Sequence, residues 1–407
     1  MKFSKRKIAI IGAGQSGLQL AIHLQQQKNY TISLYTDRTA DQIRCGRLMS
    51  SQVLFNTATQ REKVLGLNFW DNQCTHNTSV TFSLSPTNSK EQAIHWVGYI
   101  DPYQSIDQRL KLPRWMEKFE ELGGELIVKN IDLKSLDQIT NDHELTIVAT
   151  GKREISQLFL RNDNRSPFNA PQRALAGLAV KNMLPSFTPP GTHFVVIPNV
   201  GEYFTTPGLT HNGDCEMMVF EGIPGGPFDS WDTITSPEAF LDHAKTLLKL
   251  FIPSEAERCS AIKLADENAF LAGRFTPTVR HPTYISGCGK AVIGLGDTIV
   301  LNDPIAAQGA NHACKSAFLY GEAIIQHDDK PFDEKWMHEV AELSWNTHGR
   351  PACELSELFL MPLRKSDLAL FKSASENKTL ANRIANGLDD PASMSWLLKQ
   401  NSMTINF

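Results

Sequence analysis

Three glycines near the N-terminus stand where a phosphate group could be held. Gly12, Gly14 and Gly17 form the pattern G-x-G-x-x-G between an apolar run, residues 7–11, and a segment with leucines at helical spacing. In such a turn the first glycine allows a tight bend, the second lets backbone approach a pyrophosphate, and the third lets helix and strand pack closely. The helix N-terminus then favours the negative charge of the phosphates. The pattern therefore predicts a dinucleotide site, without distinguishing FAD from NAD.

The position that usually binds the adenosine ribose is ambiguous in this chain. Residues 30–35 are typical of the second strand of such a unit. The nearest acidic residue, Asp37, lies about two positions later than the usual ribose-binding acid. Whether Asp37 binds ribose or only ends the strand stays open at this point.

A second polar segment lies near residue 300. Asp297 follows the apolar run at residues 291–295, where its carboxylate could accept hydrogen bonds from ribityl hydroxyls. Gly309 and Asn311 would begin a helix, predicted from about residue 310, whose N–H groups could face the anionic edge of a flavin. An N-terminal dinucleotide turn followed by this segment is more specific than either motif alone.

With both motifs, the chain resembles the flavoprotein aromatic hydroxylase superfamily, whose FAD domain has the glutathione-reductase fold. The resemblance implies that FAD is bound by both motifs and contacted by Arg47 and by Arg109, the latter at the start of a helix expected over residues 105–125. A solvated helix charge is the alternative for Arg109. The residues expected to bind FAD are Gly12, Gly14, Gln15, Ser16, Gly17, Arg47, Arg109, Gly296, Asp297, Pro304, Gly309 and Asn311.

One superfamily motif is missing. Single-component members carry an Asp-Gly motif that serves FAD and the nicotinamide cofactor, whereas the strand at residues 145–149 is followed by Thr150-Gly151-Lys152, and the chain contains no Asp-Gly dipeptide. It also contains no second G-x-G-x-x-G pattern. We therefore expect that the protein does not reduce its own flavin.

Several stretches resemble one branch of the superfamily, the two-component styrene and indole monooxygenases. They are YTDR at 35–38, GRLMSSQVLFNTATQRE at 46–62, DQRLKLP at 107–113, VATGK at 148–152, SPFNAPQRALAGL at 166–178 and IGLGDTIVLNDPIAAQGAN at 293–311. The resemblance implies an epoxidase that receives reduced, diffusible FAD from a separate NADH-dependent flavin reductase and uses O₂ as co-substrate. A C4a-hydroperoxide of the flavin would carry the chemistry, so no catalytic side chain is nominated.

The segment after Arg47 is expected to border the flavin and the substrate. Ser50, Gln52 and Leu54 alternate there, so a strand would point all three to one face. Within the branch, Ser, Gln and an apolar residue resemble the indole enzymes rather than the styrene enzymes. A serine or glutamine could also accept a hydrogen bond from an indole N–H. We therefore expect epoxidation of the C2=C3 bond of indole, in an indigo-forming reaction, although these residues could instead only pack.

Three other functions stay open. A styrene monooxygenase, which converts styrene to styrene oxide, differs only in substrate. A single-component aromatic hydroxylase would oxidise NAD(P)H without a reductase. A flavin-fold binding protein without turnover would not need the retained Asp297 and Asn311.

Composition narrows the class of protein. The 407 residues carry a net charge of −4 and include no long Lys/Arg block, so neither nucleic acid nor a membrane surface is an expected partner. Seven scattered cysteines without a CxxC pair, and histidines without ligand spacing, give no indication of a metal site or a disulfide framework. With no signal peptide or membrane-spanning run, we expect a cytoplasmic protein, with a homodimer left open.

The pattern of elements predicts an α/β fold. We expect a glutathione-reductase-like FAD-binding Rossmann domain, discontinuous over residues 1–75, 105–165 and 276–325. Short alternating runs predict an inserted β-sheet substrate domain at residues 76–104 and 166–275. Residues 326–407 are expected to form a helical C-terminal region.

Overall fold

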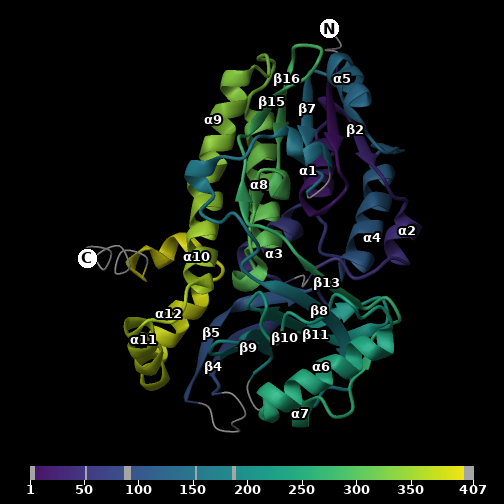
Figure 1. Cartoon of the computed structure of the whole chain (residues 1–407). Coiled ribbons are helices and arrows are strands. Elements are labelled where there is room, and N and C mark those ends of the chain that lie inside the picture. Colours follow the sequence, from purple (N-terminus) through teal and green to yellow (C-terminus); the bar gives the residue numbers. More distant parts are fainter. Residues whose placement is uncertain (1–4, 51–52, 87–92, 152–153, 186–188, 398–407) are drawn as a thin grey trace.

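The computed structural model describes residues 5–50, 53–86, 93–151, 154–185 and 189–397. Two β-sheets lie one above the other, with helix α8 between them and a column of C-terminal helices along one side (Figure 1). The fold is mixed α/β, as the sequence predicts.

The upper sheet is the predicted dinucleotide-binding sheet. Its strand order is β15-β16-β7-β1-β2-β6, and all neighbours are parallel except the β15–β16 pair. The strands are β1 (Arg6–Ile11), β2 (Tyr30–Thr36), β6 (Glu125–Val128), β7 (Leu145–Val148), β15 (Thr283–Ile285) and β16 (Ala291–Gly294). Four helices belong with this sheet: α1 (Gln15–Gln25), α4 (Gln108–Glu121), α5 (Leu133–Asp142) and α8 (Gln308–Gln326).

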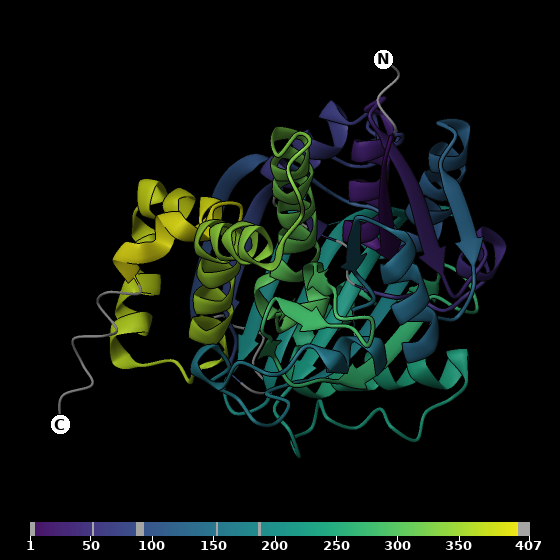
Figure 2. The ribbon, with the colours of Figure 1, turned by 90° about the horizontal axis from the view of Figure 1, so that it is seen from above.

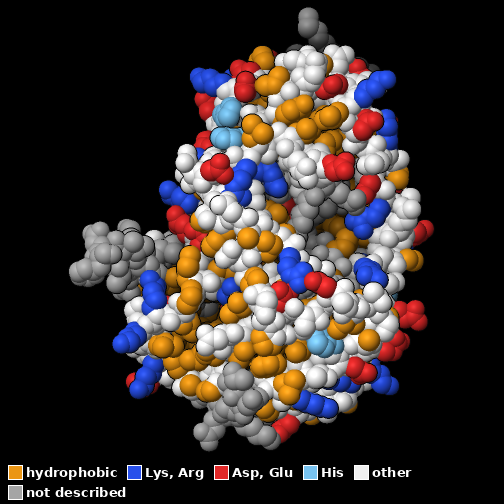
Figure 3. All heavy atoms as spheres, in the orientation of Figure 1, with side chains coloured by type: hydrophobic (Ala, Val, Ile, Leu, Met, Phe, Trp, Pro, Cys, Tyr) orange, Lys and Arg blue, Asp and Glu red, His pale blue; other side chains and the backbone are white. Residues whose placement is uncertain are grey.

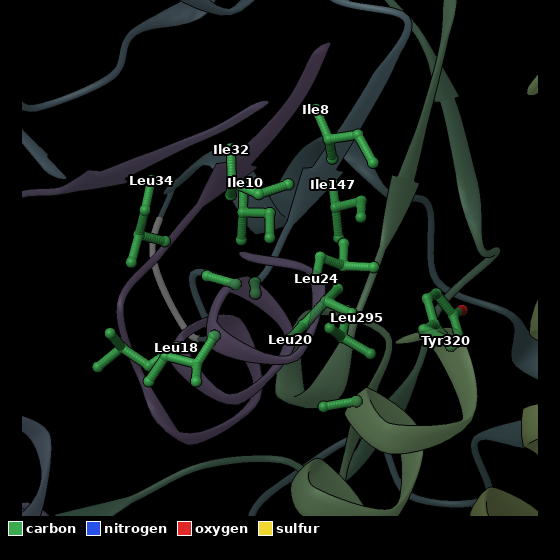
Figure 4. Packing of buried hydrophobic residues seen from close by; sticks show 14 of the residues in the cluster. Ile8, Ile10, Leu18, Leu20, Leu24, Ile32, Leu34, Ile147, Leu295 and Tyr320 are labelled. Atoms are coloured by element: carbon green, nitrogen blue, oxygen red, sulfur yellow. The ribbon is translucent and has the colours of Figure 1, made fainter. Parts of the chain in front are cut away.

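The apolar run of β1 forms a strand because both of its faces are covered, as is usual in parallel sheets. Ile8 and Ile10 point to the side of α1, where they meet Leu20 and Leu24 of that helix (Figure 4). Ala9 and Ile11 pack on the other face with Leu136 of α5. These contacts fix the C-terminal end of β1, where the glycine turn begins.

The lower sheet has nine strands in the order β12-β8-β11-β10-β9-β4-β5-β3, with β13 also paired to β8. The strands are β3 (Val53–Leu54), β4 (Asn77–Leu84), β5 (Ile94–Ser105), β8 (Ala174–Lys181), β9 (Gly191–Ile197), β10 (Gly201–Thr210), β11 (Gly213–Gly222), β12 (Lys263–Leu264) and β13 (Phe270–Arg274). Helices α6 (Pro237–Phe251) and α7 (Pro253–Arg258) cover the face turned away from the upper sheet (Figure 1). Strand β5 continues to Ser105, one residue past the expected boundary at 104/105.

The C-terminal region is helical, as expected. It comprises α9 (Glu334–Ser344), a π-helical turn (Trp345–Gly349), α10 (Arg350–Leu360), α11 (Lys365–Glu376) and α12 (Lys378–Asn386). Seen from above, α10 to α12 stand to one side, away from the N-terminal strands (Figure 2). Helix α9 instead packs against α8 and β15 of the upper half. The remaining elements are α2 (Ala40–Arg44), α3 (Asn56–Val64), β14 (Thr278–Val279), β17 (Val300–Leu301) and short 3₁₀ turns, of which η3 (Gly296–Thr298) and η4 (Pro304–Ala306) border the site. Among the described residues, no helix is both long and apolar enough to cross a membrane.

Candidate functional site

A cavity of about 660 Å³ lies where the glycine turn meets the lower sheet. Both predicted motifs line it, although they are separated by some 280 residues of sequence. The predicted residues that line this cavity, called the flavin cavity below, are Gly12, Gly14, Gln15, Ser16, Ser50, Asp297, Pro304 and Gly309. Its size falls in the range of cofactor and ligand sites.

The three glycines of the turn have different physical roles. Gly12 has φ +115°, and a Cβ there would lie 2.3 Å from the Ala149 carbonyl oxygen. A Cβ on Gly17 would lie 1.9 Å from the Gly12 carbonyl oxygen, so this glycine permits the close packing of α1 on the turn. A Cβ on Gly14 would meet nothing within 4 Å, and Gly14 lines the cavity. The open space above Gly14 is where backbone could approach a pyrophosphate.

Two helices begin at the cavity without a capping side chain. Helix α1 follows Gly14 and has no acidic residue in its first turn. Helix α8 follows Ala307, which has φ +53°. Their first N–H groups therefore have no side-chain acceptor of their own, and a helix N-terminus in this state attracts an anionic group.

Other polar groups in the cavity also lack partners. Among the described residues, the buried hydroxyls of Ser50 and Thr150 have no hydrogen-bond partner. Asp37 and Arg38 line the end of the cavity beside β2. Since buried polar groups are normally satisfied, unpaired hydroxyls beside uncapped helix ends indicate a polar ligand. The donor set, the cavity volume and the space above Gly14 all fit FAD.

A second cavity, of about 640 Å³, lies between the lower sheet and the C-terminal helices. Its walls come from β4, β9 and β10, from η4, and from α10, α11 and α12. The lining is largely apolar and rich in aromatic rings, so this cavity, called the apolar cavity below, suits an uncharged organic molecule. The aromatic residues that line it are Phe55, Phe82, Trp96, Phe168, Phe194, Phe204, Phe359 and Phe371.

The two cavities share a wall. Val53 and Ala307 line both of them. The Asn311 side chain joins these segments, because its Nδ2 donates to the Val53 carbonyl at 3.1 Å and to the Ala307 carbonyl at 2.7 Å. Its Oδ1 accepts the Phe55 N–H at 2.8 Å. A flavin in the first cavity and a substrate in the second would therefore meet at this wall.

The predicted substrate-binding trio is divided by the structure. Ser50 lines the flavin cavity, and Gln52 lies outside the described residues. Leu54 lines neither cavity, because it is buried with Ala58 and Cys314 under helix α8. Val53 of β3 and Phe55, the residue before α3, line the apolar cavity instead. The structure therefore places Leu54 away from both cavities, and its role toward the substrate stays a prediction.

Arg109 also departs from its expected role. Its side chain is fully buried, pairing with Asp107 at 2.7 Å and with Asp266 at 2.8 Å, and it does not line the flavin cavity. Burial lowers the pKa of Arg109, but hydrogen bonds to the two carboxylates outweigh it and raise the pKa overall. Arg109 thus ties the start of α4 to the segment before β13.

Four other predicted cofactor residues stand outside the cavity lining. Arg47 is exposed, with its guanidinium 5.0 Å from the centre of the Phe270 ring. Gly17 and Gly296 act through backbone shape, since a Cβ on Gly296 would lie 2.6 Å from the Ser16 hydroxyl. Asn311 is fully buried and holds the shared wall rather than lining either cavity.

A buried group of carboxyls lies behind the shared wall. Asp303 accepts the Ile305 N–H at 3.1 Å and so caps η4. Burial raises the pKa of Asp303 to about 6, and burial together with the nearby carboxyls of Asp303 and Glu202 raises the pKa of Glu221 well above its usual value. Glu202 in turn forms a two-pronged ion pair with Arg173 at 2.7 and 2.9 Å. A proton kept on Glu221 leaves that carboxyl neutral, which avoids two adjacent buried charges.

Sequence reasoning missed most of the apolar cavity. The strand residues of β4 and β9 that line it alternate with others, a pattern that marks a strand without saying what its inner face contacts. The contributions of α10 to α12 depend on packing across more than 100 residues of sequence. Phe168, Phe194 and Phe204, which line this cavity, are spread over 36 residues of sequence, so no local motif marks them.

The comparisons with known proteins agree with this geometry. The family model described as "Styrene monooxygenase A putative substrate binding domain" matches residues 151–258, which include β8 to β11 and α6. Styrene monooxygenase StyA of Pseudomonas fluorescens is 30% identical over 340 residues, 79% of this chain and 78% of the relative. Styrene monooxygenase StyA of Pseudomonas sp shows the same identity and coverage.

Solved structures share the fold at low identity. The flavin-dependent brominase Bmp2 superposes with a TM-score of 0.67 at 15% identity, over 98% of this chain and 100% of that chain. The flavin-dependent halogenase CmlS gives a TM-score of 0.65 at 14% identity, over 98% and 71%. These neighbours support the glutathione-reductase-like FAD-binding fold. The curated relatives show that the chain belongs to the styrene monooxygenase family and is a flavoprotein monooxygenase that uses FAD and O₂.

Proposed function

We propose that this monooxygenase epoxidises the C2=C3 bond of indole, using reduced FAD supplied by a separate NADH-dependent flavin reductase. One oxygen atom of O₂ adds across the double bond, and the other leaves as water. Reduced FAD, when bound, supplies the two electrons and two protons and is released as FAD. The indole epoxide then isomerises to indoxyl, and O₂ oxidises and joins two indoxyl molecules to give one indigo and two water molecules.

The observation that carries this proposal is the wall shared by the two cavities. The polar flavin cavity and the apolar cavity meet at Val53 and Ala307. The turn and the helix N-termini would hold the cofactor. The aromatic walls would bind the substrate and exclude water from the reacting centre. We also assign cofactor binding to residues 1–75, 105–165 and 276–325, and substrate binding to residues 76–104 and 166–275 with the C-terminal helices.

The Ser50 hydroxyl supports indole as the substrate. It is buried, unpaired among the described residues, and lines the flavin cavity rather than the apolar cavity, three residues before the shared-wall residue Val53. The proposal therefore places the indole N–H at the shared wall, on the side of the flavin. A hydroxyl can accept a hydrogen bond from the indole N–H, which styrene lacks. Ser50→Ala should therefore reduce kcat/KM for indole about 10-fold and leave that for styrene within about 2-fold, because one neutral hydrogen bond is lost.

A styrene epoxidase is the second candidate, and the names of the curated relatives support it. Equal losses for indole and styrene on Ser50→Ala, with styrene the better substrate of the unaltered protein, would favour it.

The reductase part of the proposal rests on the sequence. No Asp-Gly dipeptide and no second G-x-G-x-x-G pattern occur in the chain. The test is to supply the purified protein with photoreduced FAD, O₂ and indole, without NADH or reductase. Indigo formation supports the proposal. In a second assay, NADH is added to the protein, FAD and indole without a reductase. Indole-stimulated NADH oxidation there would replace the proposal with the single-component reaction.

A further inference from the structure

The apolar cavity runs from the shared wall to the protein surface. Strand register orders its lining, because Val80, Phe82 and Leu84 of β4 pair with Thr192, Phe194 and Val196 of β9. The Val80 end packs with Val53 and Phe55 at the shared wall. Leu84 instead packs with the C-terminal helices. Four residues of strand span about 13 Å, so Val196 lies far from the shared wall.

The outer end of the cavity is open. Ile223 and Met361 line it and are 36% and 50% exposed. Hydrophobic side chains gather on this face between the C-terminal helices and the lower sheet (Figure 3). A substrate could therefore enter from this side and reach the wall shared with the flavin cavity.

The walls of the cavity favour flat aromatic rings. Phe82 is stacked with Trp96 at a centroid distance of 5.4 Å and lies 4.5 Å from the Phe371 ring. On the neighbouring strands, Phe194 is stacked with Phe204 at 5.8 Å. Rings in such an array offer faces and edges to further aromatic groups.

The charged groups in the lining already have partners. Arg173 and Glu202 pair with each other, and Asp367 pairs with Arg364 at 2.7 Å. Among the described lining residues, no charged side chain is left to neutralise an ionised substrate, whose burial without a partner would be costly. The ligand that fits is therefore uncharged.

The cavity is also larger than a small bicyclic ring needs. Its volume of about 640 Å³ lies in the middle of the range that encloses drug-sized ligands. Indole or styrene would occupy the end near the shared wall and leave the outer aromatic walls without contacts.

We propose, on the basis of the proposed function, that the cavity binds uncharged aromatic alkenes that carry a second aromatic or apolar group. The double bond faces the shared wall, and the second group lies between β4, β9 and the C-terminal helices. The added oxygen comes from O₂, the second oxygen leaves as water, and reduced FAD is oxidised to FAD.

The test compares styrene with 4-vinylbiphenyl, which carries the same alkene and one more ring, using photoreduced FAD and O₂. We expect kcat/KM to be at least roughly 10-fold higher for 4-vinylbiphenyl, because the added ring buries apolar surface. An equal or lower value for 4-vinylbiphenyl, with styrene oxidised, overturns this inference and leaves the proposed function intact.

Val196→Trp tests the location. It should lower kcat/KM for 4-vinylbiphenyl about 10-fold or more and leave that for styrene within about 2-fold, because it fills only the outer end. Val64→Trp, the matched control at a residue that is 75% exposed and lines neither cavity, should leave both values within about 2-fold. Equal losses of both substrates on Val196→Trp contradict the placement.

Calorimetric binding of biphenyl and benzene, which are not alkenes, provides a measurement without turnover. Biphenyl should bind at least about 10-fold more tightly than benzene, and Val196→Trp should abolish the difference. If biphenyl binds in this way but no alkene is oxidised, the proposed function fails and the cavity assignment stands. If biphenyl binds no more tightly than benzene, the inference fails.

Discussion

Asn311 Oδ1 accepts a hydrogen bond from the backbone N–H of Phe55 at 2.8 Å, across 256 residues of sequence. The same side chain donates to the carbonyls of Val53 and Ala307, which are the described residues that line both cavities. One buried amide thus fixes the spacing between the flavin cavity and the apolar cavity.

Asn311→Ala should loosen this wall. It leaves three buried backbone groups without their partner, which costs about 1–3 kcal/mol of unfolding free energy for each unsatisfied group. A larger share of the reduced FAD should then be oxidised by O₂ with release of H₂O₂ rather than with formation of product, because the substrate is no longer held against the flavin. Peroxide and product yields per reduced FAD measure this. An unchanged yield with lowered stability would show that Asn311 only supports the fold.

The glycines of the turn should separate folding from binding. Gly14→Ala places a Cβ in open cavity space, so FAD affinity should fall at least about 10-fold while the melting temperature is kept. Gly17→Ala forces a Cβ onto the Gly12 carbonyl oxygen and should cost about 1–3 kcal/mol or more of stability. Thermal melts and FAD titrations on both variants check this. Equal destabilisation by the two changes would contradict the assigned roles.

Arg109→Met should act on stability rather than on the cofactor. Asp107, which is fully buried, would lose its partner, and breaking a buried pair costs about 3–5 kcal/mol. FAD affinity per folded molecule should stay within about 2-fold, since Arg109 does not line the flavin cavity. The double variant with Asp107→Asn should be less destabilised than the sum of the single changes. If the Arg109→Met protein keeps its stability but loses FAD binding, Arg109 contacts the cofactor as the sequence predicts.

The carboxyls behind the shared wall predict a pH-dependent stability. The pKa of Glu221 is raised by burial, so its contribution to stability is full below its unfolded pKa and is lost as pH rises toward its folded pKa. Glu221→Gln removes this pH-dependent loss of stability, because glutamine does not ionise. The unfolding free energy of the Glu221→Gln variant, relative to that of the unaltered protein, should rise by up to about 1.4 kcal/mol per pH unit above roughly pH 4.5.

Chemical unfolding from pH 5 to pH 8 measures this slope. Asp303, whose pKa is raised to about 6, adds a second loss of stability between its unfolded pKa and pH 6. Exposed Glu376→Gln controls for the change in net charge. A stability difference that stays constant with pH would mean that Glu221 is ionised in the folded protein.

The parts of the site made by local chain geometry could be predicted from the sequence. The turn around Gly12 needs only its neighbours β1 and α1, and helix α8 begins within two residues of the predicted position. The strand pattern from residue 166 onward likewise predicts the sheet, because alternation is a local property.

The parts made by long-range packing could not. The pairing of Arg109 with Asp266 joins residues 157 positions apart, and a lone arginine on a helix gives no signal of a buried partner. The inward turn of Leu54 depends on a strand only two residues long and on Cys314 beneath it. Helices α10 to α12 read as amphipathic, but the cavity they close exists only once they meet β4 and β9.

The most direct test of the account is a single-turnover reaction under ¹⁸O₂ with photoreduced FAD, the purified protein and indole or styrene, without NADH. We predict one ¹⁸O atom in the organic product and a product yield that approaches the amount of reduced FAD. Gly14→Ala, as the matched variant, should give much less product at the same FAD concentration. Products without ¹⁸O, or H₂O₂ alone in place of product with a folded, FAD-binding protein, would contradict the central claim that the two adjoining cavities form one monooxygenase site.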